Sequence, residues 1–320
     1  MKFEATKITK VIEQNYSHLM PDFFEMQTEY LASLNIIYHD LDASLVAMVI
    51  TSKLYKNTIK NISSTAKISL KKFYETESFK IPASEIKIKD ISSLINLPRE
   101  TVRRKKAKLI KDNLIVLNKK TKMYSLNTEM IGKNIIDLQI ANLSKFLSKF
   151  SYYFSKNRFF VKEVSREEIR KDVEEKFLLY FTKFLDFQIS YLSKCKTLLD
   201  IESTFIVMLC SLNETSKFKN NEKPANFPDT FIKISKMKLN SGLNATSISD
   251  ITKVPRTTVL RKISQLVKSG MLKKDKFKRY SIVDFTKLGN SKKIESIVNY
   301  NVTLLGFFFT DCLETYVVKN

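Results

Sequence analysis

Two short stretches of the sequence are closely similar, and they constrain the fold more than any other feature. Residues 98–105 read Pro-Arg-Glu-Thr-Val-Arg-Arg-Lys, and residues 255–262 read Pro-Arg-Thr-Thr-Val-Leu-Arg-Lys. Each follows a short segment with helical apolar spacing and a turn, and each runs into an amphipathic tail and a basic, hairpin-like stretch. Pro is favoured in the first turn of a helix, so both stretches predict a helix with cations on its exposed side.

Similarity between the two halves of the chain extends beyond these stretches. Equivalent residues stand 156 to 161 positions apart: Gln27 with Gln188, Asp40 with Asp200, and Tyr124 with Tyr280. The offset changes only where loops are expected, which is typical of a duplicated fold. We therefore predict two repeats, residues 1–160 and 161–320.

Apolar positions recur every three or four residues far more often than they alternate, which predicts a mainly α protein. In the first half we expect helices from near Pro21 to Leu34 and from Asp42 to about Tyr55, a helix around 68–74, and a short strand at 86–88. Helices at 90–95 and 98–111, strands at 114–117 and 123–126, and a long helix at 131–150 should follow. The second half should repeat this order, with its closing helix at 294–309.

The charge distribution favours a polyanionic partner. The chain carries 55 Lys and Arg against 33 Asp and Glu, a net charge of +22. Windows 85–126 and 243–283 hold six of the nine arginines and a net charge of +8 each, in about a quarter of the chain. Arg is favoured where a flat, forked donor is needed, as in contacts to phosphate and guanine.

These windows resemble the winged helix-turn-helix transcriptional regulators, most closely the MarR-like type. The resemblance covers about 40 residues in each half and implies a winged helix-turn-helix domain with flanking helices. Together with the repeat it predicts two tandem domains, an internal duplication acting as a pseudo-dimer, which departs from the usual single-module regulator. It implies that the second helix of each domain faces the major groove of double-stranded DNA while the hairpin contacts phosphates. The implied DNA-binding residues of the first half are Arg99, Glu100, Thr101, Arg103, Arg104, Lys108, Lys119, Lys120 and Lys122. Those of the second half are Arg256, Thr257, Thr258, Arg261, Lys262, Lys273, Lys274, Lys276, Lys278 and Arg279.

Two details distinguish the copies. Gly270 stands where the second helix must end in a left-handed residue, and Asn113 occupies that place in the first copy. Lys106 replaces the apolar Ile263, so its stem should lie on the core while its ammonium reaches outward.

Other residues give no sign of an enzyme, a cofactor or a metal site. The three cysteines are scattered without a CxxC pair, and the two histidines lie in no triad-like or metal-like pattern. The paired acids at 40, 42, 200 and 202 precede expected helices, so capping explains them better than catalysis. Tyr30 and Tyr191 could line a ligand pocket, but core packing is the better interpretation.

Three functions fit this pattern. The leading hypothesis is a sequence-specific DNA-binding transcriptional regulator; the alternatives are a plasmid or phage replication initiator and a nucleoid-type architectural protein. A winged domain used for protein contact is disfavoured by the Arg enrichment. We expect a cytoplasmic, nucleoid-associated protein without a membrane span, because the apolar run at 304–309 is too short. The pattern leaves open an unknown small-molecule effector and a choice between a monomeric pseudo-dimer and a homodimer.

Overall fold

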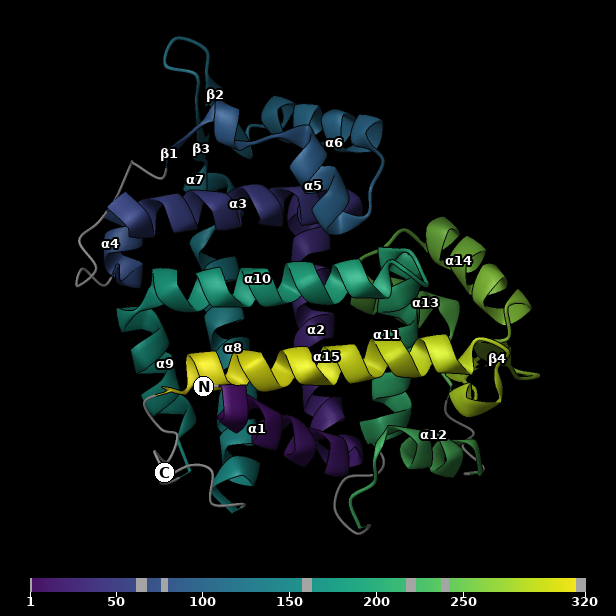
Figure 1. The fold of residues 1–320 in the computed structure, drawn as a ribbon. Helices are drawn as coiled ribbons and strands as arrows, with labels where there is room; N and C mark the ends of the chain where they lie inside the picture. Colours follow the sequence, from purple (N-terminus) through teal and green to yellow (C-terminus); the bar gives the residue numbers. More distant parts are fainter. Residues whose placement is uncertain are drawn as a thin grey trace. The chain divides into compact units, whose positions relative to one another are not determined.

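The computed structural model describes residues 2–61, 68–75, 80–156, 163–216, 223–236 and 242–314. The protein is mainly helical, at 76% helix, with small antiparallel sheets (Figure 1). This confirms the fold class expected from the apolar periodicity.

The chain divides into two compact units that interleave along the sequence. Unit 1 comprises residues 1–36, 149–163 and 194–320, and unit 2 comprises residues 37–148 and 164–193. These boundaries differ from the predicted halves, 1–160 and 161–320. The reason is an exchange of helices: α2 (Tyr16–Tyr38) lies mostly in the unit that contains the second motif, and α10 (Phe177–Cys195) lies mostly in the unit that contains the first.

Unit 2 is built around α3 (Leu41–Asn61), which contacts α5 (Ile88–Ile95), α6 (Arg99–Lys111) and the strands (Figure 1). Its sheet has the order β1-β3-β2, formed by β1 (Lys80–Pro82), β2 (Ile115–Asn118) and β3 (Met123–Leu126). Phe73 of α4 (Leu70–Glu75) is fully buried between Tyr55 and Phe177, with ring centroids 5.9 and 4.7 Å away. The unit also contains α7 (Thr128–Ile131), α9 (Arg166–Glu175), and most of α8 (Lys133–Lys156).

The helix pair α5–α6 forms where the motif predicted it. Asn96 ends α5 in the left-handed conformation, with φ 50°, and Pro98 precedes the first turn of α6. Asn113 has φ 56°, which confirms the left-handed residue expected after the second helix. The strand expected at 86–88 is wrong: Ile88 begins α5, because Ile88, Ile91 and Ile95 follow helical spacing, and the strand is β1.

Unit 1 contains the equivalent elements of the second motif. These are α13 (Ala245–Thr252), α14 (Arg256–Lys268), β4 (Leu272–Lys274) and β5 (Tyr280–Ile282). Lys253 is left-handed after α13, as Asn96 is after α5, and Gly270 has φ 75° as expected. A single bridge joins Leu243 to Tyr280, the counterpart of the pairing between Ile81 and Tyr124.

The remaining helices of unit 1 include one that the sequence pattern did not suggest. α1 (Lys2–Gln14) packs on the closing helix α15 (Ser291–Cys312), and Gly306 lets the two approach closely. The start expected near Pro21 is also wrong, because α2 begins at Tyr16 and Pro21 lies inside it. α11 (Ile201–Thr215) and α12 (Phe227–Lys236) complete the unit.

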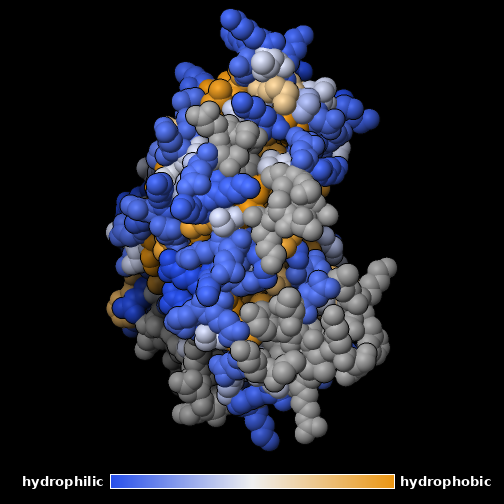
Figure 2. Space-filling model, turned by 90° about the vertical axis from the view of Figure 1, so that its left-hand side faces the viewer, coloured by the Kyte–Doolittle hydropathy of each residue, from blue (hydrophilic) through white to orange (hydrophobic). Residues whose placement is uncertain are grey.

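Hydrophilic side chains cover most of the coloured surface in Figure 2, with apolar side chains confined to small patches between them. Within the described ranges, no helix taken alone is long and apolar enough to cross a membrane; α2 and α3 meet that requirement only as a consecutive pair.

Candidate nucleic-acid interface

The outward side of α6 carries most of the residues expected to contact DNA. Arg99, Glu100, Arg103 and Arg104 are exposed, and Thr101 is half-buried. Val102 and Leu109 are buried on the opposite side, so the helix shows its cations to solvent because its apolar side is fixed on the unit 2 core. The Arg103 guanidinium pairs with the Glu100 carboxylate at 3.0 Å, one turn apart.

α14 presents a similar but simpler face. Arg256, Thr257 and Arg261 are exposed and Thr258 is half-buried. The apolar side of the helix buries Val259, Ile263 and Leu266. Leu260, 39% exposed, stands where the first motif has Arg103, and Thr257 stands where it has Glu100, so the two faces differ in charge at two positions.

Lys262 does not lie on this face, contrary to the prediction. Only 7% of the residue is exposed, and its ammonium contacts the Asp200 carboxylate at 2.7 Å and the Glu202 carboxylate at 3.6 Å. The physical reason is helical spacing, since Lys262 shares the buried side with Val259 and Ile263. We therefore remove Lys262 from the candidate DNA contacts.

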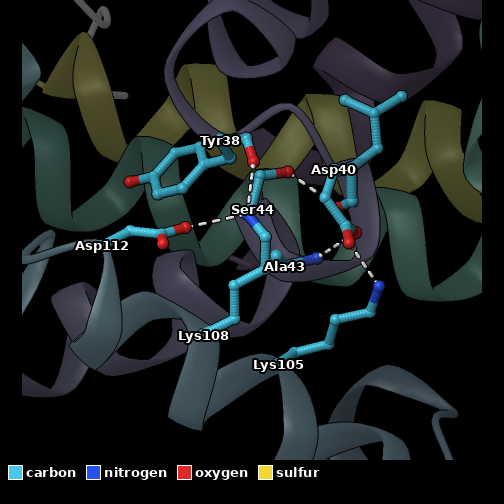
Figure 3. Close-up of polar contacts among 8 residues, drawn as sticks. Tyr38, Asp40, Ala43, Ser44, Lys105, Lys108 and Asp112 are labelled. Atoms are coloured by element: carbon cyan, nitrogen blue, oxygen red, sulfur yellow. Dashed lines mark hydrogen bonds and ion pairs between the residues drawn. The ribbon is translucent and has the colours of Figure 1, made fainter.

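The first motif has the same arrangement, which Figure 3 shows. Lys105 of α6 reaches the carboxylate of Asp40, which also accepts the backbone N–H of Ala43 at 2.9 Å. Asp200 caps α11 in the same way, accepting from the Ser203 N–H at 2.9 Å. The capping role expected for both aspartates is confirmed, and each also anchors a lysine of the following motif helix.

The anchoring lysines could have been found in the sequence. Lys105 and Lys262 recur 157 residues apart, and their aspartate partners recur 160 residues apart. A charge pair that recurs with both motifs is a signal of contact.

Lys108 and Lys106 lie at the edge of the interface. The Lys108 ammonium donates to Asp112 at 2.8 Å and to the Tyr38 carbonyl at 3.3 Å, so it is committed to the protein (Figure 3). The Lys106 ammonium lies 5.2 Å from the centroid of the Tyr124 ring, and the residue is half-buried. The contact with Tyr124 agrees with the expectation that the aliphatic stem of Lys106 lies along the core.

The two hairpins place the remaining expected cations in solvent. Lys119, Lys120 and Lys122 are exposed between β2 and β3, and the side-chain oxygen Oδ1 of Asn118 accepts from the Lys120 and Thr121 N–H groups at 3.0 Å. In the second hairpin, Lys273 and Lys274 are exposed on β4, and Lys276 and Lys278 are exposed between β4 and β5, with Arg279 half-buried. Exposed cations on a hairpin beside a cationic helix could neutralise phosphates on a duplex.

Two carboxylates, Asp200 and Glu202, hold Lys262 of α14 in place. Burial would raise the pKa of Asp200, but hydrogen bonds from Lys262 and the Ser203 N–H, together with the Lys262 charge, bring it below its usual value. Burial raises the pKa of Glu202 more than its own backbone hydrogen bond and Lys262 lower it. Asp200, the nearer carboxylate, therefore carries the charge that pairs with Lys262, and Glu202 is the easier of the two to protonate.

No other cluster of reactive groups stands out among the described residues. Cys195, Cys210 and Cys312 are buried, and burial together with Glu214 raises the pKa of Cys210 to about 12. No group of three or more His, Cys, Asp or Glu side chains in these ranges could hold a metal ion. Tyr30 and Tyr191 are 4% exposed and pack in the core.

Comparison with protein-family models, with curated proteins and with solved structures finds no match, so the arrangement of these residues is the basis for assigning a function.

Proposed function

We propose that the protein is a sequence-specific regulator of transcription that binds double-stranded DNA through two winged helix-turn-helix modules of MarR-like type. Its recognition helices are α6 and α14, and its wings are the β2–β3 and β4–β5 hairpins. The observation that carries the proposal is that an exposed, arginine-bearing helix followed by a basic hairpin occurs in both units. Such a protein would act on the nucleoid in the cytoplasm.

The position and exposure of the arginines favour DNA over a protein as the partner. Arg104 and Arg261 occupy the same position of their helices and are both exposed. Exposed arginines lie on each helix, and exposed lysines lie on the hairpin that follows it, so a duplex bound by a module could contact both. Arg can donate to guanine O6 and N7 in the major groove, and Lys on the wings can pair with backbone phosphates.

A contact between the closing helices supports a pseudo-dimer within one chain. In unit 1, Phe150 near the end of α8 stacks on Phe309 of α15, with ring centroids 4.5 Å apart and an interplanar angle of 14°. Phe154 adds an edge contact to Phe309 at 5.3 Å. Helices that close the two repeats would make such contacts if they formed the dimer-like core of a duplicated regulator.

The test is DNA binding measured by fluorescence anisotropy over a range of salt concentrations, after selection of bound sites from a random pool. With about four to six phosphates neutralised by each module, log affinity should fall against log salt with a slope magnitude of roughly 7–10. Arg104→Ala and Arg261→Ala should each weaken binding by about 1–3 kcal/mol.

Lys171→Ala, an exposed cation of α9 outside both modules, is the matched control and should leave affinity unchanged. A flat salt slope would refute DNA binding. A steep slope without any selected motif would favour an architectural protein.

A further inference from the structure

The tip of the β4–β5 hairpin exposes an aromatic ring. Phe277 is 60% exposed, the highest value among the large apolar residues that the structure describes as exposed. Burying a Phe side chain contributes roughly 1.5–3 kcal/mol, so a ring left in solvent forgoes that gain in the folded protein.

The hairpin holds this ring in a fixed place. Asp275 organises the tip: its carboxylate accepts the N–H groups of Phe277 at 2.9 Å and of Arg279 at 2.8 Å. The Asp275 N–H donates to the Arg279 carbonyl at 3.0 Å, and the Lys278 N–H donates to the Asp275 carbonyl at 3.2 Å. A tip tied by four hydrogen bonds has little backbone freedom left to lose on binding, so the ring projects from a fixed backbone position.

Cations surround the ring. The Lys276 ammonium lies 5.1 Å and the Arg279 guanidinium carbon 5.3 Å from the ring centroid. An apolar protein groove would have to remove these charges from water without pairing them, which is costly. A partner that fits must offer a flat apolar surface between rows of anions, and the base steps of a DNA duplex between its phosphates have that chemistry.

The first hairpin lacks this feature although its tip is built alike. Asn118 stands 157 residues before Asp275 and accepts the N–H two residues later, which belongs to Lys120. Lys120 is thus the counterpart of Phe277. One wing ends in a cation and the other in an aromatic ring flanked by cations.

We propose that Phe277 is a wedge that enters the minor groove beside the second half-site and partly unstacks one base step, with Lys276 and Arg279 on the adjacent phosphates. The proposal rests on the proposed DNA-binding function and adds to it that the two modules treat DNA differently. The second module would kink its half-site, whereas the first would contact only the backbone through its wing. Minor-groove proteins use apolar side chains in this way.

The experiment places 2-aminopurine, whose fluorescence rises on unstacking, at successive steps flanking the selected site. The wild-type protein should raise fluorescence at one step beside the second half-site. Phe277→Ala should abolish that rise and weaken binding by about tenfold, within the range for a stacked base. Its salt slope should stay the same because no charge is removed. Phe277→Leu should keep part of the fluorescence change, since an aliphatic side chain can also act as a wedge.

Lys120→Ala is the matched control in the other hairpin, and it should lower the salt slope by about one without changing the fluorescence. Wild-type binding and fluorescence retained in Phe277→Ala would overturn the wedge and leave the DNA-binding function standing. No binding of the wild type to any duplex would overturn both. In that case, Phe277-dependent binding to vesicles of phosphatidylserine and phosphatidylcholine would assign the ring to a membrane surface.

Discussion

Adjacent residues of α14 should separate stability from DNA binding. Lys262 is buried against Asp200 and Glu202, whereas Arg261 is exposed. We expect Lys262→Met to lower the free energy of unfolding by about 1.5–3 kcal/mol, the usual contribution of a hydrogen bond to a charged group. A fully buried pair would cost more, but the Asp200 side chain is 44% exposed and regains water when the lysine is lost. Methionine keeps the apolar stem in place.

The loss of stability in Lys262→Met should depend on pH. The folded-state pKa of Asp200 lies below its ordinary value of 3.8, so the pair stabilises the protein above that pH and ceases to do so as pH falls through the lowered value. The difference in the free energy of unfolding between wild type and Lys262→Met should therefore have its full value at pH 7 and shrink below about pH 4. It can be measured by urea unfolding with circular dichroism.

Arg261→Met is the matched control. Its free energy of unfolding should lie within about 0.5 kcal/mol of the wild-type value, and it should bind DNA more weakly. The reasoning fails if Lys262→Met unfolds like the wild type and lowers the salt slope instead.

Three further changes test the packing and the interface. Gly306→Ala should lower the free energy of unfolding by about 1–2 kcal/mol, because the added Cβ would lie 2.2 Å from the Thr9 hydroxyl and 3.0 Å from the Ala5 carbonyl. Gly289→Ala should not lower it, because no described atom lies within 4 Å of a Cβ added there. Gln27→Leu should raise the urea midpoint, because the Gln27 amide is fully buried with no hydrogen-bond partner among the residues that the structure describes, and a leucine there leaves no unpaired group. A lower midpoint would mean that the amide is hydrogen-bonded, for example to water. Glu100→Thr frees Arg103 and makes the two helix faces more alike, so the selected DNA motif should become more symmetric; an unchanged motif would remove Glu100 from recognition.

The local structure of each motif could be predicted because short-range rules decide it. Pro98 and Asn113 bracket α6, and the observed β2 and β3 begin and end within one residue of the expected strands. The position of Lys262 was open to the same reasoning, since its spacing from Val259 puts it on the buried side. A basic motif favours an outward lysine, but the burial of the neighbouring Val259 and Ile263 decides the side on which Lys262 lies.

The start of α2 and the presence of α1 could not be read in this way. Pro21 is favoured in the first turn of a helix, yet here it lies within α2. Asn15 anchors the true start: its carbonyl accepts the N–H groups of His18 and Leu19 at 3.0 Å. α1 is defined by its packing on α15 at Gly306, a contact across almost the whole chain. Local periodicity carries no information about such a partner.

The exchange of helices between the two halves of the sequence is the largest departure from the expected organisation, and two hydrogen bonds show it. In unit 1 the Asn35 amide, on α2, donates to the Lys253 carbonyl at the turn between α13 and α14, at 2.7 Å. In unit 2 the Asn96 amide, at the turn between α5 and α6, donates to the Ser193 carbonyl of α10 at 3.4 Å. Each turn is thus held by a helix from the other half of the sequence.

The exchange predicts that neither half of the sequence folds alone. Residues 1–160 keep α2 but lose the elements of unit 1 that it packs with, and residues 161–320 lose α1 and α2 while keeping an unmatched α10. Both helices are buried along nearly their whole length, so an isolated half would expose a large apolar surface. Each half expressed alone should lack a cooperative urea transition and bind a hydrophobic dye, whereas the two halves expressed together should form a soluble one-to-one complex that unfolds cooperatively. A cooperative transition in either isolated half would show that the repeats are independent domains, and the exchange would then contribute little to stability.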